Sequence, residues 1–442
     1  MYINKIFVFL IDVILYELSF YLAFIIRFGN EFPEKDTIDF LEMIPWFFLV
    51  FIIFSLIYNI YSEYKKIDDT LVSLICVILL TTAVNLALAF VLNHFAISRL
   101  HIVVSVVLQF ILLGLWRYIV WKKALLIRQP KKAMIIGYPS EIKRLIQSIN
   151  NSLARGMQIE KELRLNGKDN FNEQWSKIVL EKGTDNIEVI IICSSVRQDS
   201  RKKIIDYCIQ SGTMVMIVPD FYDIVLQNAR LVSAGDTPII QLQGLLAAQS
   251  PMIFIKRAMD ITLSFVAMII LFPLGLLIAL SIKVSSPGPI FYKQVRMGLK
   301  GEKFKVYKFR TMVQDAEKMS GPVLAKERDP RITTVGRILR QTRLDEIPQF
   351  WNVFIGDMSL VGPRPERPFF VEQFSEDLPE FKYRHCVKGG ITGLAQIEGN
   401  YSTEPDKKLT YDLLYAQNNN VLTDFILLFR TAKVLLQKGK AS

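Results

Sequence analysis

Four apolar segments near the start of the chain constrain its fold more than any other feature. They run over Ile6–Ile26, Met43–Tyr61, Leu71–Leu92 and His101–Trp121, and about 20 apolar residues of helix span the hydrocarbon core of a bilayer. The whole chain is 51% hydrophobic with a mean hydropathy of +0.29, high for a soluble protein and low for a pure channel or transporter. We therefore expect residues 1–121 to form a bundle of four transmembrane helices attached to soluble domains.

Basic residues after the fourth segment set the expected orientation. Cations close to a span favour the cytoplasmic side, and this stretch carries Lys122, Lys123, Arg128, Lys131 and Lys132. With an even number of spans, the N-terminus and everything from residue 122 onward then start in the cytoplasm. The formal net charge of +11 also favours an anionic membrane surface or another polyanion as a partner. We expect a multi-pass membrane protein whose soluble domains face the cytoplasm.

Two acidic residues, Asp12 and Glu17, lie inside the first apolar segment. A charged side chain is costly at this depth. One interpretation places both on a path for lipid or protons, and the other has them facing the bundle interior with hydrogen-bonding partners. The second interpretation is favoured, because nothing else in the four segments resembles a transport path.

The cysteines and histidines indicate neither a disulfide framework nor a zinc site. The chain has 4 cysteines and 3 histidines, and the cysteines are far apart in sequence, at Cys76, Cys193, Cys208 and Cys386. No pair has the short spacing that metal sites use. We expect reduced thiols.

Residues 132–243 alternate between strand and helix patterns. "KAMIIGYPS", "NIEVIIICSS" and "TMVMIVPD" have the pattern of buried strands, and "EIKRLIQSINNSL" and "DSRKKIIDYCIQSG" that of helices. This alternation predicts a doubly wound, Rossmann-like α/β domain with a mostly parallel sheet. The first strand-to-helix turn, Gly137–Ser140, lacks the glycines with which such folds approach a pyrophosphate. A structural or oligomerisation role is favoured, and a regulatory nucleotide site remains open.

A fifth long apolar segment, Ala258–Ile282, has cations on both flanks. A crossing helix would carry the remaining, strongly basic part of the chain to the outside. Pro273 interrupts the segment, and a proline inside a helix removes a hydrogen bond and favours a kink. We expect a re-entrant helix over residues 256–283 that dips into the membrane, breaks near Pro273 and returns. A kinked helix that spans the bilayer is the alternative.

The segment after this helix is rich in cations. Lys283–Arg310 contains eight Lys or Arg residues against one acidic residue, Glu302. Such a cluster beside a membrane suits anionic headgroups or a phosphorylated lipid. A solvated basic face that holds the domain to the bilayer explains the same pattern.

An adjacent pair of carboxylates, Asp345 and Glu346, precedes the rigid sequence Gly-Pro-Arg-Pro around Arg364. We expect a helix to begin near Asp345, with Pro348 in its first turn. Neighbouring residues on a helix project in different directions, so one carboxylate can attack phosphorus while the other binds a hard cation such as Mg²⁺. Arg364 offers a preorganised fork for phosphate. A solvated helix start is the commoner explanation of an Asp-Glu pair, but the surrounding arginines favour metal-assisted phosphoryl transfer at the membrane.

Four ordered motifs in the last part of the chain resemble the monotopic bacterial polyprenyl-phosphate phosphoglycosyl transferases. They are "KRAMD", "SPGPIFYKQVRMGLKGEKFKVYKFRTM", "LDEIPQFWNVFIGDMSLVGPRPE" and "GGITGLAQIEG". The resemblance implies a catalytic domain over residues 252–442, and the whole chain is similar to the long, WbaP-like architecture. It further implies transfer of a sugar 1-phosphate from a UDP-sugar to undecaprenyl phosphate with release of UMP. This reaction initiates capsule, exopolysaccharide or O-antigen synthesis at the bacterial plasma membrane.

The resemblance also implies roles for individual residues. Asp345 corresponds to the nucleophile that forms a covalent phosphosugar intermediate, and Glu346 to its Mg²⁺-binding partner. Pro273 corresponds to the break in the membrane helix, although Phe272 replaces the serine that usually precedes this proline. The loop Lys388–Leu394, which the resemblance implies contacts sugar or uridine, departs from the family pattern. We expect the following residues of the motifs to contact substrate: Gln294, Arg296, Lys308, Arg310, Arg340, Pro363 and Arg364.

The expected partners are a UDP-sugar, undecaprenyl phosphate and membrane lipids, with no nucleic acid. Glucose and galactose are the favoured sugars, and a homo-oligomer remains open. A non-catalytic scaffold or sensor of polysaccharide assembly is the alternative from another class, but it has no need for an intact Asp345–Glu346 pair. A polyisoprenyl glycosyltransferase would release UDP instead of UMP.

Overall fold

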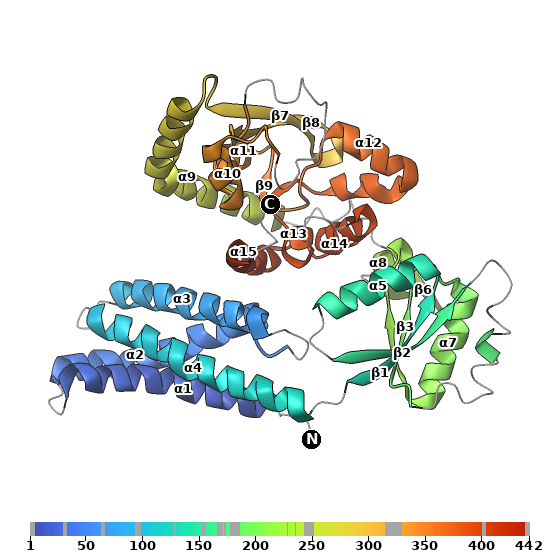
Figure 1. Ribbon diagram of the computed structural model, residues 1–442, viewed down its shortest axis with the longest axis horizontal. Coiled ribbons are helices and arrows are strands. Elements are labelled where there is room, and N and C mark those ends of the chain that lie inside the picture. The colour runs from blue at the N-terminus through green and yellow to red at the C-terminus, as the bar shows by residue number, and fades with distance from the viewer. Residues whose placement is uncertain are drawn as a thin grey trace. The chain divides into compact units, whose positions relative to one another are not determined.

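The structure is a computed structural model that divides into two compact units, Met1–Asp220 and Phe221–Ser442 (Figure 1). It describes residues 5–29, 33–62, 67–92, 99–127, 130–152, 156–165, 171, 174–176, 186–227, 229–234, 236–242, 252–313, 329–399 and 404–437. The chain is mostly helical, with several long apolar helices and one α/β region. This composition of elements is consistent with a membrane protein.

Four of the apolar helices lie in the first unit: α1 (Lys5–Phe28), α2 (Glu34–Ile57), α3 (Ile67–Val91) and α4 (Arg99–Ile127). They confirm the four helices predicted from hydropathy. The helix α1 packs against α4, and α3 packs against both α2 and α4. Together with α9 of the second unit, the described residues hold 5 helices that are long and apolar enough to cross a membrane.

The polar residues of the first helix lie inside this group of helices. Asp12 is buried and forms an ion pair with Arg117 of α4. Tyr16 is fully buried, and its hydroxyl accepts a hydrogen bond from Asn85 Nδ2 at 3.2 Å. For Asp12 the hydrogen-bonded interior position is therefore confirmed, because a buried carboxylate needs a paired cation to offset its desolvation.

The α/β region is a parallel sheet in the order β2-β1-β3-β4. Its strands are β1 (Lys131–Gly137), β2 (Met157–Arg164), β3 (Val189–Ile192) and β4 (Met214–Ile217). Alternate residues of β1 enter two different cores: Ala133 and Ile135 pack with α5 (Pro139–Ser152), whereas Met134 and Ile136 pack with α7 (Gln198–Ser211). Helices thus cover both faces of the sheet. The three predicted strands and both helices are confirmed, but the charged edge strand β2 was missed.

The turn after β1 contains no phosphate cradle of the expected kind. Glu141 lies in the first turn of α5, and its carboxylate accepts hydrogen bonds from Ser194 Oγ, at 3.2 Å, and from Ser195 Oγ. A carboxylate at this helix start repels phosphate. The turn Gly137–Ser140 also lacks the glycines that let a backbone approach a pyrophosphate closely.

The second unit begins with α8 (Phe221–Gln227), a hairpin of β5 (Arg230–Ala234) and β6 (Thr237–Gln241), and the apolar helix α9 (Met252–Ser285). Its remaining elements are β7 (Phe291–Met297), η1 (Leu299–Gly301), β8 (Lys303–Phe309), α10 (Thr334–Gln341), η2 (Leu344–Glu346), α11 (Gln349–Ile355), β9 (Ser359–Val361), α12 (Pro368–Asp377), η3 (Pro379–Cys386), β10 (Gly390–Thr392), α13 (Leu394–Glu398), α14 (Pro405–Gln417) and α15 (Val421–Leu436).

The helix α9 is continuous through Pro273 and bends into two arms (Figure 1). The predicted interruption is therefore a bend inside one helix and not a gap of non-helical residues. A proline produces such a bend because its ring displaces the preceding turn and removes one hydrogen bond. The apolar side chains around the bend, including Ile270, Phe272 and Leu276, are exposed.

Both arms of α9 pack against the same short part of the second unit. At the start, Arg257 donates to the carbonyl oxygens of Val353 (2.6 Å) and Phe354 (2.8 Å) in α11. Near the end, Ile278 and Ile282 are buried in a cluster with Leu339 of α10. The two arms therefore return to one folded domain.

Candidate active site

Asp345 and Glu346 are both buried and lie on η2, which is one turn of 3₁₀ helix. The helix α11 begins four residues after Asp345, at Gln349, with Pro348 as its N-cap. A helical segment therefore begins near Asp345 as predicted, but its first turn is 3₁₀ and the α-helix starts only at Gln349, so Pro348 is the N-cap and not a residue of the first turn. The turn is closed by a hydrogen bond from Glu346 N to Arg343 O of 3.2 Å, and Arg343 has a positive φ of 56°. This left-handed conformation is costly for arginine, so the packing around the turn must fix it.

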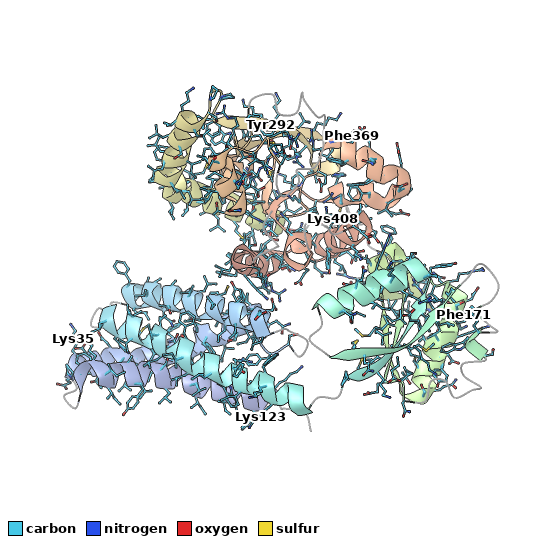
Figure 2. All side chains as sticks on the ribbon, in the orientation of Figure 1. Lys35, Lys123, Phe171, Tyr292, Phe369 and Lys408 are labelled. Atoms are coloured by element: carbon cyan, nitrogen blue, oxygen red, sulfur yellow. The ribbon has the colours of Figure 1, made fainter. Side chains whose placement is uncertain are left out.

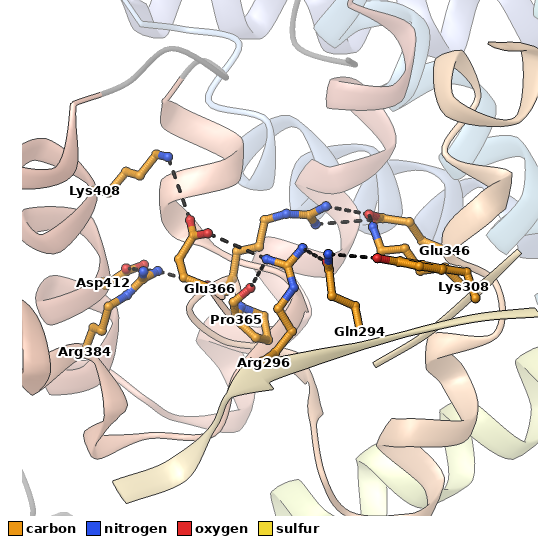
Figure 3. Close-up of polar contacts among 11 residues, drawn as sticks. Gln294, Arg296, Lys308, Glu346, Pro365, Glu366, Arg384, Lys408 and Asp412 are labelled. Carbon is orange, nitrogen blue, oxygen red and sulfur yellow. Dashed lines mark hydrogen bonds and ion pairs between the residues drawn. The ribbon is translucent and has the colours of Figure 1, made fainter. Parts of the chain in front are cut away.

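The Glu346 carboxylate is held by two cations (Figure 3). Lys308 Nζ donates to Glu346 Oε1 at 2.7 Å. Arg364 donates from Nη2 to Oε1 at 2.5 Å and from Nη1 to Oε2 at 3.3 Å. Burial alone would raise the pKa of Glu346, but Arg364 and Lys308 outweigh it and hold that pKa well below its usual range. Glu346 is thus an ionised, positioned carboxylate.

The Asp345 carboxylate has different neighbours from the Glu346 carboxylate, as expected for adjacent residues of one turn. Its Oδ2 lies 3.9 Å from Lys308 Nζ, which is longer than a hydrogen bond. Burial raises the pKa of Asp345 above its ordinary value, Lys308 opposes the rise, and the charge of Glu346 adds to it. Asp345 is therefore the less neutralised carboxylate of the pair.

Lys308 reaches the pair because α11 fixes strand β8. Asn352 of α11 donates from Nδ2 to Lys305 O at 2.8 Å and accepts from Tyr307 N at 3.0 Å. This double contact secures the backbone directly before Lys308. Burial lowers the pKa of the Lys308 ammonium, although Glu346 opposes the effect.

Two arginines hold the Gly-Pro-Arg-Pro loop by its backbone carbonyls. Arg296 of β7 donates to Pro365 O at 3.0 Å, and Arg384 of η3 donates to Arg364 O at 3.0 Å. Gln294 in turn accepts from Arg296 Nη2 at 2.6 Å. These contacts hold the loop from which Arg364 reaches Glu346. A small pocket beside them is lined by Met297, Gly298, Pro363, Arg364, Pro365 and Arg384. Burial lowers the pKa of Arg296 to about 10.

Two other predicted substrate residues, Arg340 and Arg310, donate hydrogen bonds to other groups of the protein. Arg340 Nε donates to Thr311 Oγ1 at 2.9 Å. The guanidinium of Arg310 is buried and donates to Ser286 O at 2.8 Å and Pro287 O at 2.9 Å. Arg310 thus ties the loop after α9 to β8. Its predicted contact with substrate stays a prediction.

Glycines allow the loop Lys388–Leu394 to lie directly against the Gly-Pro-Arg-Pro loop. Gly390 N donates to Pro363 O at 2.9 Å, and Gly362 N donates to Thr392 O at 2.9 Å. A Cβ on Gly362 would overlap the carbonyl oxygen of Lys388. The loop Lys388–Leu394 therefore supports the loop that carries Arg364, whatever its contacts with sugar or uridine.

The sequence did not reveal two buried ion pairs that brace this site. Arg384 Nη2 lies 2.8 Å from Asp412 Oδ2. Lys256, at the start of α9, forms an ion pair with Asp424 and donates to Tyr415 OH at 3.0 Å. The partners are separated by 28 or more positions in the chain, so no local pattern could join them. The hydrophobic periodicity of α14 and α15 predicts on which face of each helix Asp412 and Asp424 lie. It does not predict the cation that pairs with either residue.

The carboxylate pair fits a hard cation that is also bound by substrate. Mg²⁺ takes oxygen ligands and commonly binds one or two carboxylates plus substrate phosphates. Among the residues that the structure describes, no group of three or more His, Cys, Asp or Glu side chains could hold a metal, so phosphate oxygens would have to complete the coordination. Both Glu346 oxygens already contact cations, so Mg²⁺ at Glu346 would replace part of the contact with Arg364 or Lys308.

Comparison with known proteins identifies relatives of the part of the chain that contains Asp345 and Glu346. Positions 252–438 match the family model of the bacterial sugar transferases. The chain is 42% identical over 186 residues to the UDP-N-acetylgalactosamine-undecaprenyl-phosphate N-acetylgalactosaminephosphotransferase of Aeromonas hydrophila, which covers 41% of this chain and 44% of that protein. It is 34% identical over 264 residues to the UDP-glucose:undecaprenyl-phosphate glucose-1-phosphate transferase of Klebsiella pneumoniae, which covers 58% of this chain and 56% of that protein.

A shorter relative is matched over nearly its full length. The chain is 41% identical over 194 residues to an exopolysaccharide production protein of Rhizobium leguminosarum bv. phaseoli, which covers 42% of this chain and 97% of that protein. The matches with the two longer relatives span about half the length of each. The match with the Rhizobium protein covers 194 residues. This is about the length of the segment 252–438, which matches the family model and contains Asp345 and Glu346.

Proposed function

The chain belongs to the bacterial sugar transferase family, and on this premise we propose that it transfers a hexose 1-phosphate from a UDP-sugar to undecaprenyl phosphate, releasing UMP. Glucose and galactose are the proposed sugars. The names of relatives support the class of donor and acceptor, and the Rhizobium relative, named an exopolysaccharide production protein, supports a role in exopolysaccharide or related polysaccharide synthesis. The site residues carry the reaction as follows.

The unequal environments of Asp345 and Glu346 are the observation that carries this proposal. Glu346 is neutralised by Arg364 and Lys308 within hydrogen-bond distance, whereas Asp345 Oδ2 is 3.9 Å from Lys308. A carboxylate without a close partner can attack phosphorus, and cations beside it can bind the phosphate oxygens. A scaffold or sensor does not require this division between two neighbouring carboxylates.

The proposed reaction proceeds in two steps that share one phosphorus atom. An Asp345 carboxylate oxygen attacks the phosphorus bonded to the sugar, the bond to the bridging oxygen of UMP breaks, and UMP leaves with the electron pair. A phosphate oxygen of undecaprenyl phosphate then attacks the same phosphorus and displaces Asp345 as a free carboxylate. Arg364 and Lys308 are placed to contact the phosphate oxygens in both steps.

Mg²⁺ is the proposed cofactor, bound by Asp345, Glu346 and substrate phosphates. When bound, it would neutralise negative charge on the transferring phosphate. Removing divalent metal with EDTA should therefore abolish UMP release, and Mg²⁺ should restore it. Turnover that persists in EDTA would contradict this assignment.

We further propose that α1–α4 span the plasma membrane as a four-helix bundle and that α9 is re-entrant. A straight helix of 34 residues is about 50 Å long, which would place its ends on opposite sides of a bilayer. Instead, Arg257 at the start of α9 contacts α11, and Ile282 near its end packs with Leu339 of α10. The α/β region is then a cytoplasmic, Rossmann-like domain with a structural role, which the Glu141 carboxylate near its first turn supports.

The experiment that tests the function uses the full chain in detergent or nanodiscs with undecaprenyl phosphate and a panel of UDP-sugars. The panel contains UDP-glucose, UDP-galactose and UDP-N-acetylgalactosamine, and UMP and UDP are measured separately. We expect UMP from UDP-glucose or UDP-galactose, and no UMP from Asp345→Asn. A matched control, Glu372→Gln, changes an exposed carboxylate on α12 and should leave turnover unchanged. Release of UDP would contradict the proposal, because it indicates a glycosyltransferase.

A further inference from the structure

The short helix α8 belongs to the second unit, although it lies before positions 252–438, which match the family model. Its central residue, Ile224, is 2% exposed. It lies in a cluster with buried side chains of α12, η3 and α14: Val371, Phe381, Leu409 and Leu413. A segment outside the family motifs thus forms part of the core of the domain that carries Asp345.

Two further contacts attach α8 to the same elements. Gln417, the last residue of α14, donates from Nε2 to Ile224 O at 2.8 Å. The ring of Phe221 stacks on the ring of Tyr383 in η3, with 5.4 Å between the ring centroids. The helix α8 therefore joins α14 to η3 through a hydrogen bond, an aromatic pair and the shared apolar cluster.

The two elements that α8 joins also hold Arg384, which supports the loop that carries Arg364. The Arg384 guanidinium lies over the ring of Phe381, with 4.8 Å between Cζ and the ring centroid, and cation and ring attract each other in this geometry. It also forms an ion pair of 2.8 Å with Asp412 of α14 (Figure 3) and donates to Arg364 O at 3.0 Å. A displacement of η3 or α14 therefore moves the donor that fixes Arg364.

We propose that α8 is a positioning element for the transfer reaction, with Ile224 as its central residue. Ile224 keeps Phe381 in place, and Phe381 supports Arg384. Arg384 in turn holds the backbone from which Arg364 reaches Glu346. This role rests on the proposed function, in which Arg364 contacts the transferring phosphate.

Hydrogen exchange tests this route without relying on turnover. Ile224→Ala leaves a space in the cluster that contains Phe381, and the surrounding structure relaxes only partly into such a space. In the full chain in nanodiscs, amide exchange should therefore become faster in peptides that cover η3 and residues 362–366. Ile204 of α7 is a fully buried isoleucine in the α/β region, and Ile204→Ala is the matched control, which should leave these peptides unchanged. Unchanged exchange in Ile224→Ala, or an equal change in both variants, overturns the proposal.

Turnover gives a second readout that a purely stabilising role would not change. At a temperature at which each variant is fully folded by circular dichroism, Ile224→Ala should lower kcat about 10-fold or more, because misplacing a catalytic group by about 1 Å can cost about 100-fold. Ile224→Val should retain most of the activity, and Ile204→Ala all of it.

A double variant shows whether α8 acts through Arg364. Arg364→Lys removes the two-point contact with Glu346, so Ile224→Ala should lower kcat less in this background than in the parent, since residues on one route are not additive. An equal loss in both backgrounds overturns the proposal, as does a normal kcat in folded Ile224→Ala.

Two further outcomes are distinguished by the same measurements. If Ile224→Ala does not fold, Phe221→Leu, which loses the stacking contact with Tyr383, takes its place in each experiment with the same expected direction. A parent chain that releases no UMP contradicts the proposed function, and hydrogen exchange still decides whether α8 holds the loop that carries Arg364.

Discussion

Glu346 and Arg364 form a two-point ion pair, with Arg364 Nη2 2.5 Å from Oε1 and Nη1 3.3 Å from Oε2. The pair joins the turn η2 to the Gly-Pro-Arg-Pro loop, 18 residues further along the chain. Because Lys308 also donates to Glu346, one carboxylate organises both cations that face Asp345. The geometry of the site therefore depends on Glu346, whereas Asp345 is the proposed nucleophile.

Glu346→Gln should abolish this organisation. Loss of the negative charge leaves Arg364 and Lys308 close together without compensation, so we expect turnover to fall at least about 100-fold. Arg364 is 39% exposed, so water screens part of the effect, and we expect a loss of about 1–3 kcal/mol in the free energy of unfolding. Rates of UMP release and thermal unfolding in detergent measure both effects. Near-normal turnover would contradict the role given to Glu346, and Glu302→Gln on the exposed loop before β8 is the control.

The pH dependence of turnover should reflect Asp345. Its raised pKa means that the carboxylate takes up a proton at a higher pH than its ordinary value of 3.8, and a protonated carboxyl group cannot attack phosphorus. As pH falls, kcat/KM should therefore decrease through an apparent pKa above that value, while Glu346 with its lowered pKa stays ionised. Lys308 opposes the rise at Asp345, so Lys308→Gln should move the acid limb to higher pH. Lys305→Gln, an exposed position on the same strand, should leave the profile in place.

Labelling from outside intact cells should distinguish a re-entrant α9 from a spanning one. Val284, at the end of α9, is 81% exposed, and Val284→Cys should react with a membrane-impermeant thiol reagent only after the cells are permeabilised. Lys35 and Lys123 lie at opposite ends of the four helices of the first unit (Figure 2), so Lys35→Cys should react from outside and Lys123→Cys should not. Reaction of Val284→Cys at the rate of Lys35→Cys would show that α9 crosses the membrane.

Gly362→Ala should disrupt the support of the Arg364 loop. The added methyl group would overlap Lys388 O and approach Gly390 N, so the two loops must separate, and overpacking of this kind costs about 1–3 kcal/mol. We expect lower thermal stability together with a loss of turnover. Gly275→Ala is the matched control, because its added methyl group would lie 3.9 Å from the Phe309 ring. Equal stability of the two variants would contradict the close loop contact.

Local sequence patterns predicted the elements but not the connections between distant ones. Hydropathy gave all five apolar helices, and alternation gave β1, β3 and β4, since those signals lie within one element. The charged strand β2 was missed because its eight residues, MQIEKELR, pair along one edge of the sheet and need no continuous apolar run.

The site was predictable as a set of residues and not as a geometry. The motifs identified Asp345, Glu346 and Arg364, but the expected helix at Asp345 is a 3₁₀ turn preceded by Arg343 in a left-handed conformation. Helix propensity acts within the segment, whereas Glu346 on the turn contacts Lys308 and Arg364, which lie elsewhere in the chain and could not be read from the local sequence. Arg310 illustrates the same limit: its position in a basic motif suggested phosphate, while the structure places its guanidinium on Ser286 and Pro287.

The most direct test of the central claim is to trap the sugar phosphate on Asp345. The full chain is incubated with Mg²⁺ and a UDP-sugar but without undecaprenyl phosphate, quenched, digested and analysed by mass spectrometry. We predict a peptide containing Asp345 whose mass is increased by one hexose phosphate, formed with one equivalent of UMP and lost when undecaprenyl phosphate is added. Asp345→Asn should give neither product. UMP release at normal rates from Asp345→Asn, or a phosphosugar on another residue, would contradict the account.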